Sequence, residues 1–212
     1  MARTALNLPL LVLVISSLFF TPMLATPMVK AGNILPDFTD VAQPVENGDV
    51  NTLFGVYVPN VLALPVIQQP SGNAGYVSNK DDQATQFGMA SQFGSVGLLA
   101  HNYLSGRFFS ELTVGQEVRL VYGNGRVEYF VITEILRYQA LEPNSELSSF
   151  RNLDHPEVLS AEQMFKRVYA GERHVTFQTC IEANGTVSWG RLFVVAKPKQ
   201  LSFDHFVEKI LQ

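Results

Sequence analysis

The sequence has a single cysteine, Cys180, among its 212 residues. One cysteine excludes an intramolecular disulfide. With only four scattered histidines, the chain also lacks the C-x-x-C and H-x-x-x-H spacings of structural zinc sites. We therefore expect neither a metal nor another cofactor. Charged residues make up only 16% of the chain, the formal net charge is −4 and no basic run occurs, so the composition gives no reason to expect nucleic-acid binding.

The sequence is apolar enough to fold, since 47% of its residues are hydrophobic, and it shows no internal repeat. Residues 1–31 are typical of a targeting segment. Arg3 is followed by an apolar stretch over 6–23, and small residues at 29 and 31 would suit cleavage after Ala31. The segment is either a cleaved signal peptide or an N-terminal membrane anchor. Either way, we expect an extracytoplasmic protein that is membrane-anchored or secreted.

The remainder of the chain has the pattern of many short strands, which favours an all-β barrel or sandwich with one or two short helices. Asn-Gly turns predict two hairpins, because both residues tolerate positive φ angles. Residues 70–94 and 142–159 are predicted to be polar connections. The expected units are a linker (32–53), a barrel domain (54–200) and a C-terminal helix that packs on the barrel (201–212). Within the barrel domain we expect strands at 55–58, 61–67 and 94–101, hairpins at 117–138 and 174–196, and a helix at 160–171.

Cys180 lies in the second predicted hairpin, and Arg191 lies on the opposite strand. Antiparallel neighbours can hold two side chains within about 5 Å of each other. His101 ends the predicted strand 94–101. A thiol reacts as its thiolate, which a neighbouring imidazolium or guanidinium favours. On the cysteine strand, alternation places Gln178 and Thr176 on the same face as Cys180, and a polar face beside a cysteine is more typical of a site than of a core.

Three local patterns in this order resemble the sortase family. Residues 176–180, TFQTC, are similar to its T-L-x-T-C signature, with Phe177 in place of Leu. Residues 99–101, LAH, resemble its strand leading to a histidine, and 189–191, WGR, resemble its strand carrying an arginine. A weaker similarity covers 108–118, and the whole resemblance runs from about Gly55 to Pro198.

The resemblance implies a closed sortase-like β-barrel and a cysteine transpeptidase. Cys180 would be the nucleophile, His101 the general acid/base and Arg191 the stabiliser of substrate and oxyanion, while Thr179 and Gln178 would contact the substrate. The implied partners are surface proteins that bear a sorting motif and an amine acceptor, either a peptidoglycan precursor or a pilin-like subunit. The N-terminal segment would provide any membrane association.

Several features leave alternatives open. Asn102 stands where sortases often carry arginine, and the separation between His101 and Cys180 is longer than usual, so substrate preference does not carry over. His174 alternates with the cysteine face and is a rival base. Papain-like proteases carry the cysteine before the histidine, and L,D-transpeptidases have a Gly-Cys-Arg context that Cys180 lacks. The principal alternative is an inactive sortase-like barrel, with a buried thiol, that binds peptides or wall components.

Overall fold

The structure is a computed structural model that describes residues 49–200. The predicted targeting segment (1–31), most of the predicted linker and the predicted C-terminal helix (201–212) lie outside the described residues. The barrel begins at Leu53, one residue before the predicted domain boundary.

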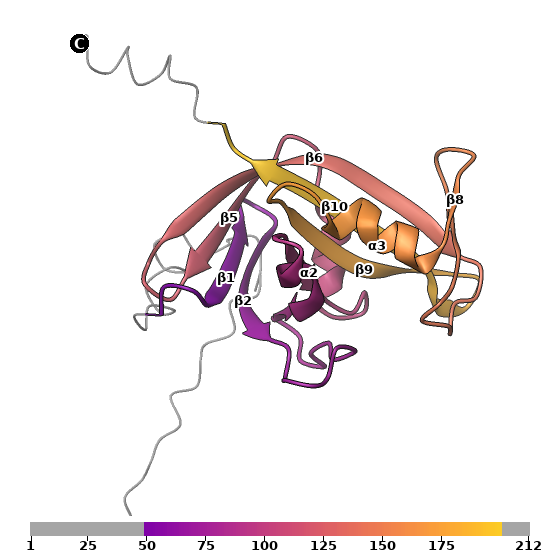
Figure 1. The fold of residues 1–212 in the computed structure, drawn as a ribbon, viewed down its shortest axis with the longest axis horizontal. Helices are drawn as coiled ribbons and strands as arrows, with labels where there is room; N and C mark the ends of the chain where they lie inside the picture. The colour runs from indigo at the N-terminus through magenta and orange to yellow at the C-terminus, as the bar shows by residue number, and fades with distance from the viewer. Residues whose placement is uncertain (1–48, 201–212) are drawn as a thin grey trace, which may run out of the picture.

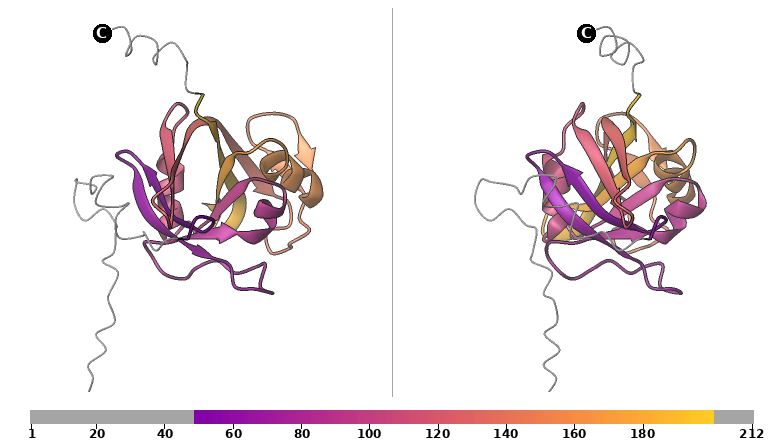
Figure 2. Two further views of the ribbon diagram at one scale, coloured as in Figure 1. Left: turned by 60° about the vertical axis from the view of Figure 1, so that its left-hand side comes forward. Right: turned by 90° about the vertical axis from the view of Figure 1, so that its left-hand side faces the viewer.

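The described residues form a closed barrel (Figures 1 and 2). Its strands follow the spatial order β10-β9-β4-β3-β2-β1-β5-β6, and β6 pairs with β10 to close the ring. The prediction of an all-β closed barrel is confirmed. The barrel strands are β1 (Leu53–Val58), β2 (Leu62–Gln68), β3 (Ala84–Phe87), β4 (Val96–Leu99), β5 (Glu117–Tyr122), β6 (Val127–Ala140), β9 (Val175–Ala183) and β10 (Thr186–Pro198).

Both predicted hairpins are present. Asn184 and Gly185 join β9 to β10 with φ angles of 53° and 73°, which asparagine and glycine tolerate better than other residues. Gly125 turns β5 into β6 with a φ of 78°, and its amide donates to the carbonyl of Tyr122 at 2.9 Å. Local turn chemistry is therefore sufficient to set these two connections.

Helix α3 (Ala161–Tyr169) lies outside the barrel, against β9 and β10 (Figure 1). It begins with the predicted capping box, in which Ser160 and Gln163 each accept a hydrogen bond from the other's backbone amide. Its apolar residues Met164 and Val168 pack on the outer face of the sheet beside Phe193. The barrel wall thus separates an inner core from this smaller outer core.

The predicted connections contain short elements. The segment 70–94 includes β3 and helix α2 (Gly88–Gln92), and 142–159 includes β7 (Phe150–Asn152) and β8 (Val158–Leu159), which extend the sheet from β6. A 3-10 helix, η2 (Ser105–Glu111), follows β4. Strands this short carry little periodicity of their own, and β3 forms through parallel pairing with β2, a partner that sequence patterns do not reveal.

Candidate active site

Cys180 and Arg191 are direct partners across the β9–β10 pair. Antiparallel partners point to the same face, and this face is the outer one, because the next pair on it joins Gln178 to Phe193 of the outer core. The predicted cross-strand relation between the thiol and the guanidinium positions is present in the structure.

His101 reaches the other side of Cys180 through β4. This strand pairs in parallel with β9, with Leu99 opposite Gln178, and the amide of Ala100 continues the ladder by donating to the Gln178 carbonyl at 3.3 Å. Extended two residues beyond the end of β4 at Leu99, this register would bring His101 beside Cys180. Neighbouring strands lie about 4.8 Å apart. On this extended register, His101, Cys180 and Arg191 would form one row from the end of β4 across β9 to β10.

The segment that carries His101 is packed tightly against β9. The carbonyl of His101 accepts hydrogen bonds from the amides of Leu104 and Gly106, at 2.9 and 3.0 Å. A Cβ atom at Gly106 would lie 2.3 Å from the Thr179 hydroxyl and 2.6 Å from the His101 carbonyl oxygen, so only glycine fits there. The backbone of His101 is consequently held in place relative to the cysteine strand.

Thr179, which the sequence predicts as a substrate contact, lies on the face of β9 opposite to that of Cys180. Its side chain is buried, and its hydroxyl donates to the carbonyl of Ala100 at 2.8 Å. The hydroxyl thus joins β9 to the end of β4. This position favours a structural role for Thr179 over contact with a substrate.

The polar face beside Cys180 is covered by α3 rather than open. The hydroxyl of Thr176 donates to the carbonyl of Val168 at 2.6 Å, and the hydroxyl of Tyr169 donates to the side-chain oxygen of Gln178. Burial raises the pKa of Tyr169, so this hydroxyl remains a donor. Gln178 lies at the edge of the covered region, two residues from the half-buried Cys180.

A bulge in β10 lies next to this row. The β9–β10 register shifts between Thr186 and Gly190, so β10 carries extra residues there. Nη1 of Arg191 donates to the carbonyls of Ser188 and Gly190, both at 2.9 Å. Nδ2 of Asn102 donates to the carbonyl of Val187 at 3.3 Å. The bulge therefore contacts both the arginine and the segment that follows His101.

His174 is poorly placed to act as a base for Cys180. It is buried, and its ring nitrogens lie 2.7 Å from the carbonyl oxygen of Glu172 and 2.9 Å from that of Val168. It precedes Cys180 by six positions, which corresponds to about 20 Å of extended strand. The contacts indicate that His174 anchors the end of α3 to the start of β9.

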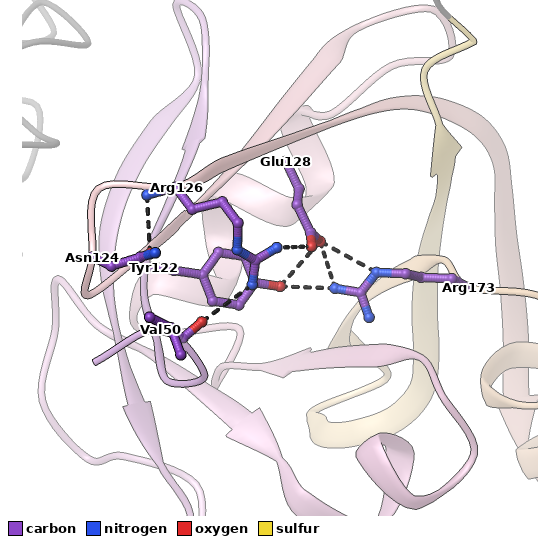
Figure 3. A network of polar contacts seen from close by, with 6 residues as sticks. All are labelled: Val50, Tyr122, Asn124, Arg126, Glu128 and Arg173. Carbon is purple, nitrogen blue, oxygen red and sulfur yellow. Dashed lines mark hydrogen bonds and ion pairs between the residues drawn. The ribbon is translucent and has the colours of Figure 1, made fainter. Parts of the chain in front are cut away.

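Figure 3 shows a second polar cluster around Glu128 and Arg173. Arg173 lies just before β9, whereas Cys180 lies near the other end of that strand. Glu128 of β6 accepts from Arg126, Arg173 and the hydroxyl of Tyr122, and the guanidinium of Arg126 lies 3.7 Å from the centre of the Tyr122 ring. Burial alone would raise the pKa of Glu128, but the hydrogen bonds from both arginines outweigh it and hold that pKa below its usual range.

The remaining features that could mark a functional site in residues 49–200 do not involve Cys180. A cavity of about 660 Å³ lies against β6 and the β7–β8 segment, lined by Tyr138, Glu157 and Arg167 among others. Residues 49–200 contain no group of three or more His, Cys, Asp or Glu side chains placed to hold a metal ion. Within the same range, no helix has the length and apolar character needed to cross a membrane.

Comparison with known proteins identifies similar solved structures. Sortase C-1 from Actinomyces oris aligns over 84% of this chain and 90% of its own, at 11% identity and a TM-score of 0.47. Sortase A from Listeria monocytogenes aligns over 73% and 89%, at 15% identity and 0.46. Sortase C from Clostridium perfringens SM101 aligns over 81% and 79%, at 15% identity and 0.43. No family profile and no curated protein matches the sequence. In fold, the chain resembles sortases of classes A and C.

Proposed function

We propose that this protein is a cysteine transpeptidase of the sortase type. One observation carries the proposal, namely the strand register: it pairs Cys180 with Arg191, and its continuation past the end of β4 would bring His101 beside Cys180. The TFQTC, LAH and WGR patterns, which resemble those of sortases, provide these same three residues. The barrel wall offers fixed backbone positions for all three, as acyl transfer requires of its catalytic groups.

In the proposed reaction, the Cys180 thiolate attacks the carbonyl carbon of a peptide bond in a sorting motif. The carbon–nitrogen bond breaks as the imidazolium of His101 gives its proton to the leaving amine, and a thioester remains on Cys180. An incoming amine then loses a proton to His101 and attacks the thioester carbonyl. The new amide bond forms, and the thiolate leaves.

Arg191 is proposed to stabilise the oxyanion and to bind substrate carbonyl groups. Its Nη1 atom is already engaged by the carbonyls of Ser188 and Gly190, and this fixes the plane of the guanidinium. The donors on Nε and Nη2 have no hydrogen-bond partner among residues 49–200. An arginine anchored on one side in this way can offer its other donors to a substrate without losing further side-chain freedom.

The proposed substrates are surface proteins with a sorting motif, and the proposed acceptor is an amine of a peptidoglycan precursor or of a pilin-like subunit. The proposed location is outside the cytoplasmic membrane, with residues 1–31 as signal peptide or anchor. Gln178 remains the proposed substrate contact because it lies at the edge of the region that α3 covers, two residues from Cys180.

The test is to incubate the full chain with a library of sorting-motif peptides, without an amine acceptor, and to measure intact mass. We expect an acyl adduct on the wild type that is absent from Cys180→Ala and strongly reduced in His101→Ala. The matched control is His174→Asn, which changes a histidine just before β9 and outside the row. If no peptide gives an adduct and the thiol is unreactive toward alkylation, the inactive peptide-binding barrel becomes the better interpretation.

A further inference from the structure

Tyr103 is a large aromatic residue that the fold leaves in solvent beside the proposed site. Its relative exposure is 60%, and its ring stacks on the imidazole of His101 with centroids 5.2 Å apart and planes inclined by 16°. This geometry is close to parallel stacking, which is favourable between aromatic rings. Among the described residues, this stack is the only ring contact of Tyr103, and its hydroxyl makes no hydrogen bond.

The backbone around Tyr103 fixes where its ring can lie. Residues 101–104 form a turn that is closed by a hydrogen bond from the Leu104 amide to the His101 carbonyl. The lack of a side chain at Gly106 allows the following 3-10 helix to pack closely against β9. Tyr103 therefore projects from a rigid turn. Its ring reaches His101 from the same short segment that carries the histidine.

The imidazole of His101 has no other orienting partner within residues 49–200, where neither ring nitrogen makes a hydrogen bond. Histidines that activate a nucleophile are usually oriented by a third group that bonds to the second ring nitrogen. Here the flat contact with Tyr103 is what restricts rotation of the imidazole about its side-chain bonds. Stacking also leaves both ring nitrogens free for the thiol and for the amine.

We propose that Tyr103 is a positioning residue that orients the imidazole of His101 toward Cys180 by stacking. The inference rests on the proposed transpeptidase function. It requires an aromatic ring at position 103 but not the tyrosine hydroxyl. The alternative is that Tyr103 contacts the substrate peptide directly, and this would place its effect on substrate binding rather than on His101.

The test compares Tyr103→Phe, which keeps the ring, with Tyr103→Leu, which removes it. We expect Tyr103→Leu to lower kcat for thioester formation about tenfold with KM nearly unchanged, and Tyr103→Phe to retain wild-type kcat. The alkylation rate of Cys180 by iodoacetamide should fall in Tyr103→Leu as well, because no peptide is present in that reaction. The matched control is Tyr129→Leu, which replaces an exposed tyrosine on β6 near Pro198, far along β10 from Arg191.

A spectroscopic measurement reports on the stack itself. In the full chain labelled at histidine, the ring protons of His101 should show an upfield ring-current shift in the wild type and in Tyr103→Phe that is lost in Tyr103→Leu. The proposal is overturned if Tyr103→Leu has wild-type kcat and alkylation rate, or if only KM changes. A wild type without any acyl adduct would instead overturn the proposed function, and that failure is recognised because it does not depend on residue 103.

Discussion

The two ends of the cysteine strand differ in how their polar groups are satisfied. Near the start of β9, Arg173 and Arg126 share the carboxylate of Glu128, and Tyr122 completes the cluster (Figure 3). Near its other end, within residues 49–200, the thiol of Cys180 and the ring nitrogens of His101 make no hydrogen bond. One end uses polar groups to join strands, and the other leaves reactive groups available.

This difference indicates which residues should affect stability and which should affect chemistry. A buried or half-buried charge is tolerated where partners surround it, and removing one partner leaves the others unsatisfied. A catalytic group needs its lone pair or proton free for the substrate. We therefore expect substitutions at the Glu128 cluster to change unfolding, and substitutions in the His101 row to change acyl transfer.

The largest effect is expected for His101→Gln. Loss of the general acid/base should lower the rate of thioester formation by a factor of about 10² to 10⁴, measured by intact mass against time with a sorting-motif peptide. The midpoint of urea unfolding should stay at the wild-type value, because the imidazole makes no hydrogen bond in the described residues. A His101→Gln variant with the wild-type rate, or one that unfolds at a much lower urea concentration, would contradict the assignment of His101 to chemistry rather than to stability.

Much of this site is predictable because it is built from local signals. One Asn-Gly turn and its flanking strands suffice to place Cys180 and Arg191 on antiparallel neighbours. Their direct pairing also depends on the bulge between Thr186 and Gly190, because the register set at the turn would otherwise pair Cys180 with Trp189. The proposed position of His101 is less local, since it depends on parallel pairing of β4 with β9, which periodicity does not reveal and which only the motif resemblance suggests.

The features that sequence reasoning missed depend on tertiary contacts. The stack of Tyr103 on His101, the β10 bulge and the covering of Thr176 by α3 have no periodic pattern to reveal them. The prediction that the polar face with Thr176 is more typical of a site than of a core was wrong for Thr176, which is buried and donates its hydroxyl to the backbone carbonyl of Val168. Thr179 is polar yet faces inward for the same reason, as its partner is the carbonyl of Ala100. Alternation tells which residues share a face, but not what covers it.

The next effect concerns the packing that holds the histidine segment. Gly106→Ala would place a Cβ atom within 2.7 Å of three oxygen atoms, two of them in the backbone of Ala100 and His101. We expect a loss of about 3 kcal/mol in the free energy of unfolding, because that backbone has to move. Urea denaturation measures it, with Gly75→Ala as the control, since a Cβ there meets nothing closer than 4.0 Å. Equal stability of the two variants would contradict the assigned packing.

At the opposite end, Glu128→Gln should destabilise the fold by about 2 kcal/mol at pH 7, after allowance for the partial exposure of both arginines. The pKa of Glu128 is lowered in the folded state, so its stabilising contribution is present above the pKa of the unfolded chain, about 4.3, and is lost as the pH falls through the folded pKa. The difference in unfolding free energy between wild type and variant should therefore shrink on acidification. Thioester formation at pH 7 should be unchanged, and a large loss of activity in a folded variant would show that the two ends are coupled.

The smallest effect overall is expected at Asn102, whose amide joins the histidine segment to the β10 bulge. Asn102→Ala removes the hydrogen bond to the Val187 carbonyl, but it also removes Oδ1, a buried oxygen that has no partner among the described residues. These two terms oppose each other, so the unfolding midpoint should hardly move. Activity should nevertheless fall by about fivefold, the factor that corresponds to one hydrogen bond of about 1 kcal/mol, because the bond fixes the distance between the His101 segment and the strand of Arg191. Stability is read from urea denaturation and activity from the thioester assay, with Asn124→Ala at the opposite hairpin as the control. If Asn102→Ala loses stability and keeps its rate, the contact is a structural link like those of the Glu128 cluster. The two ends of β9 would then not differ in the way that we propose.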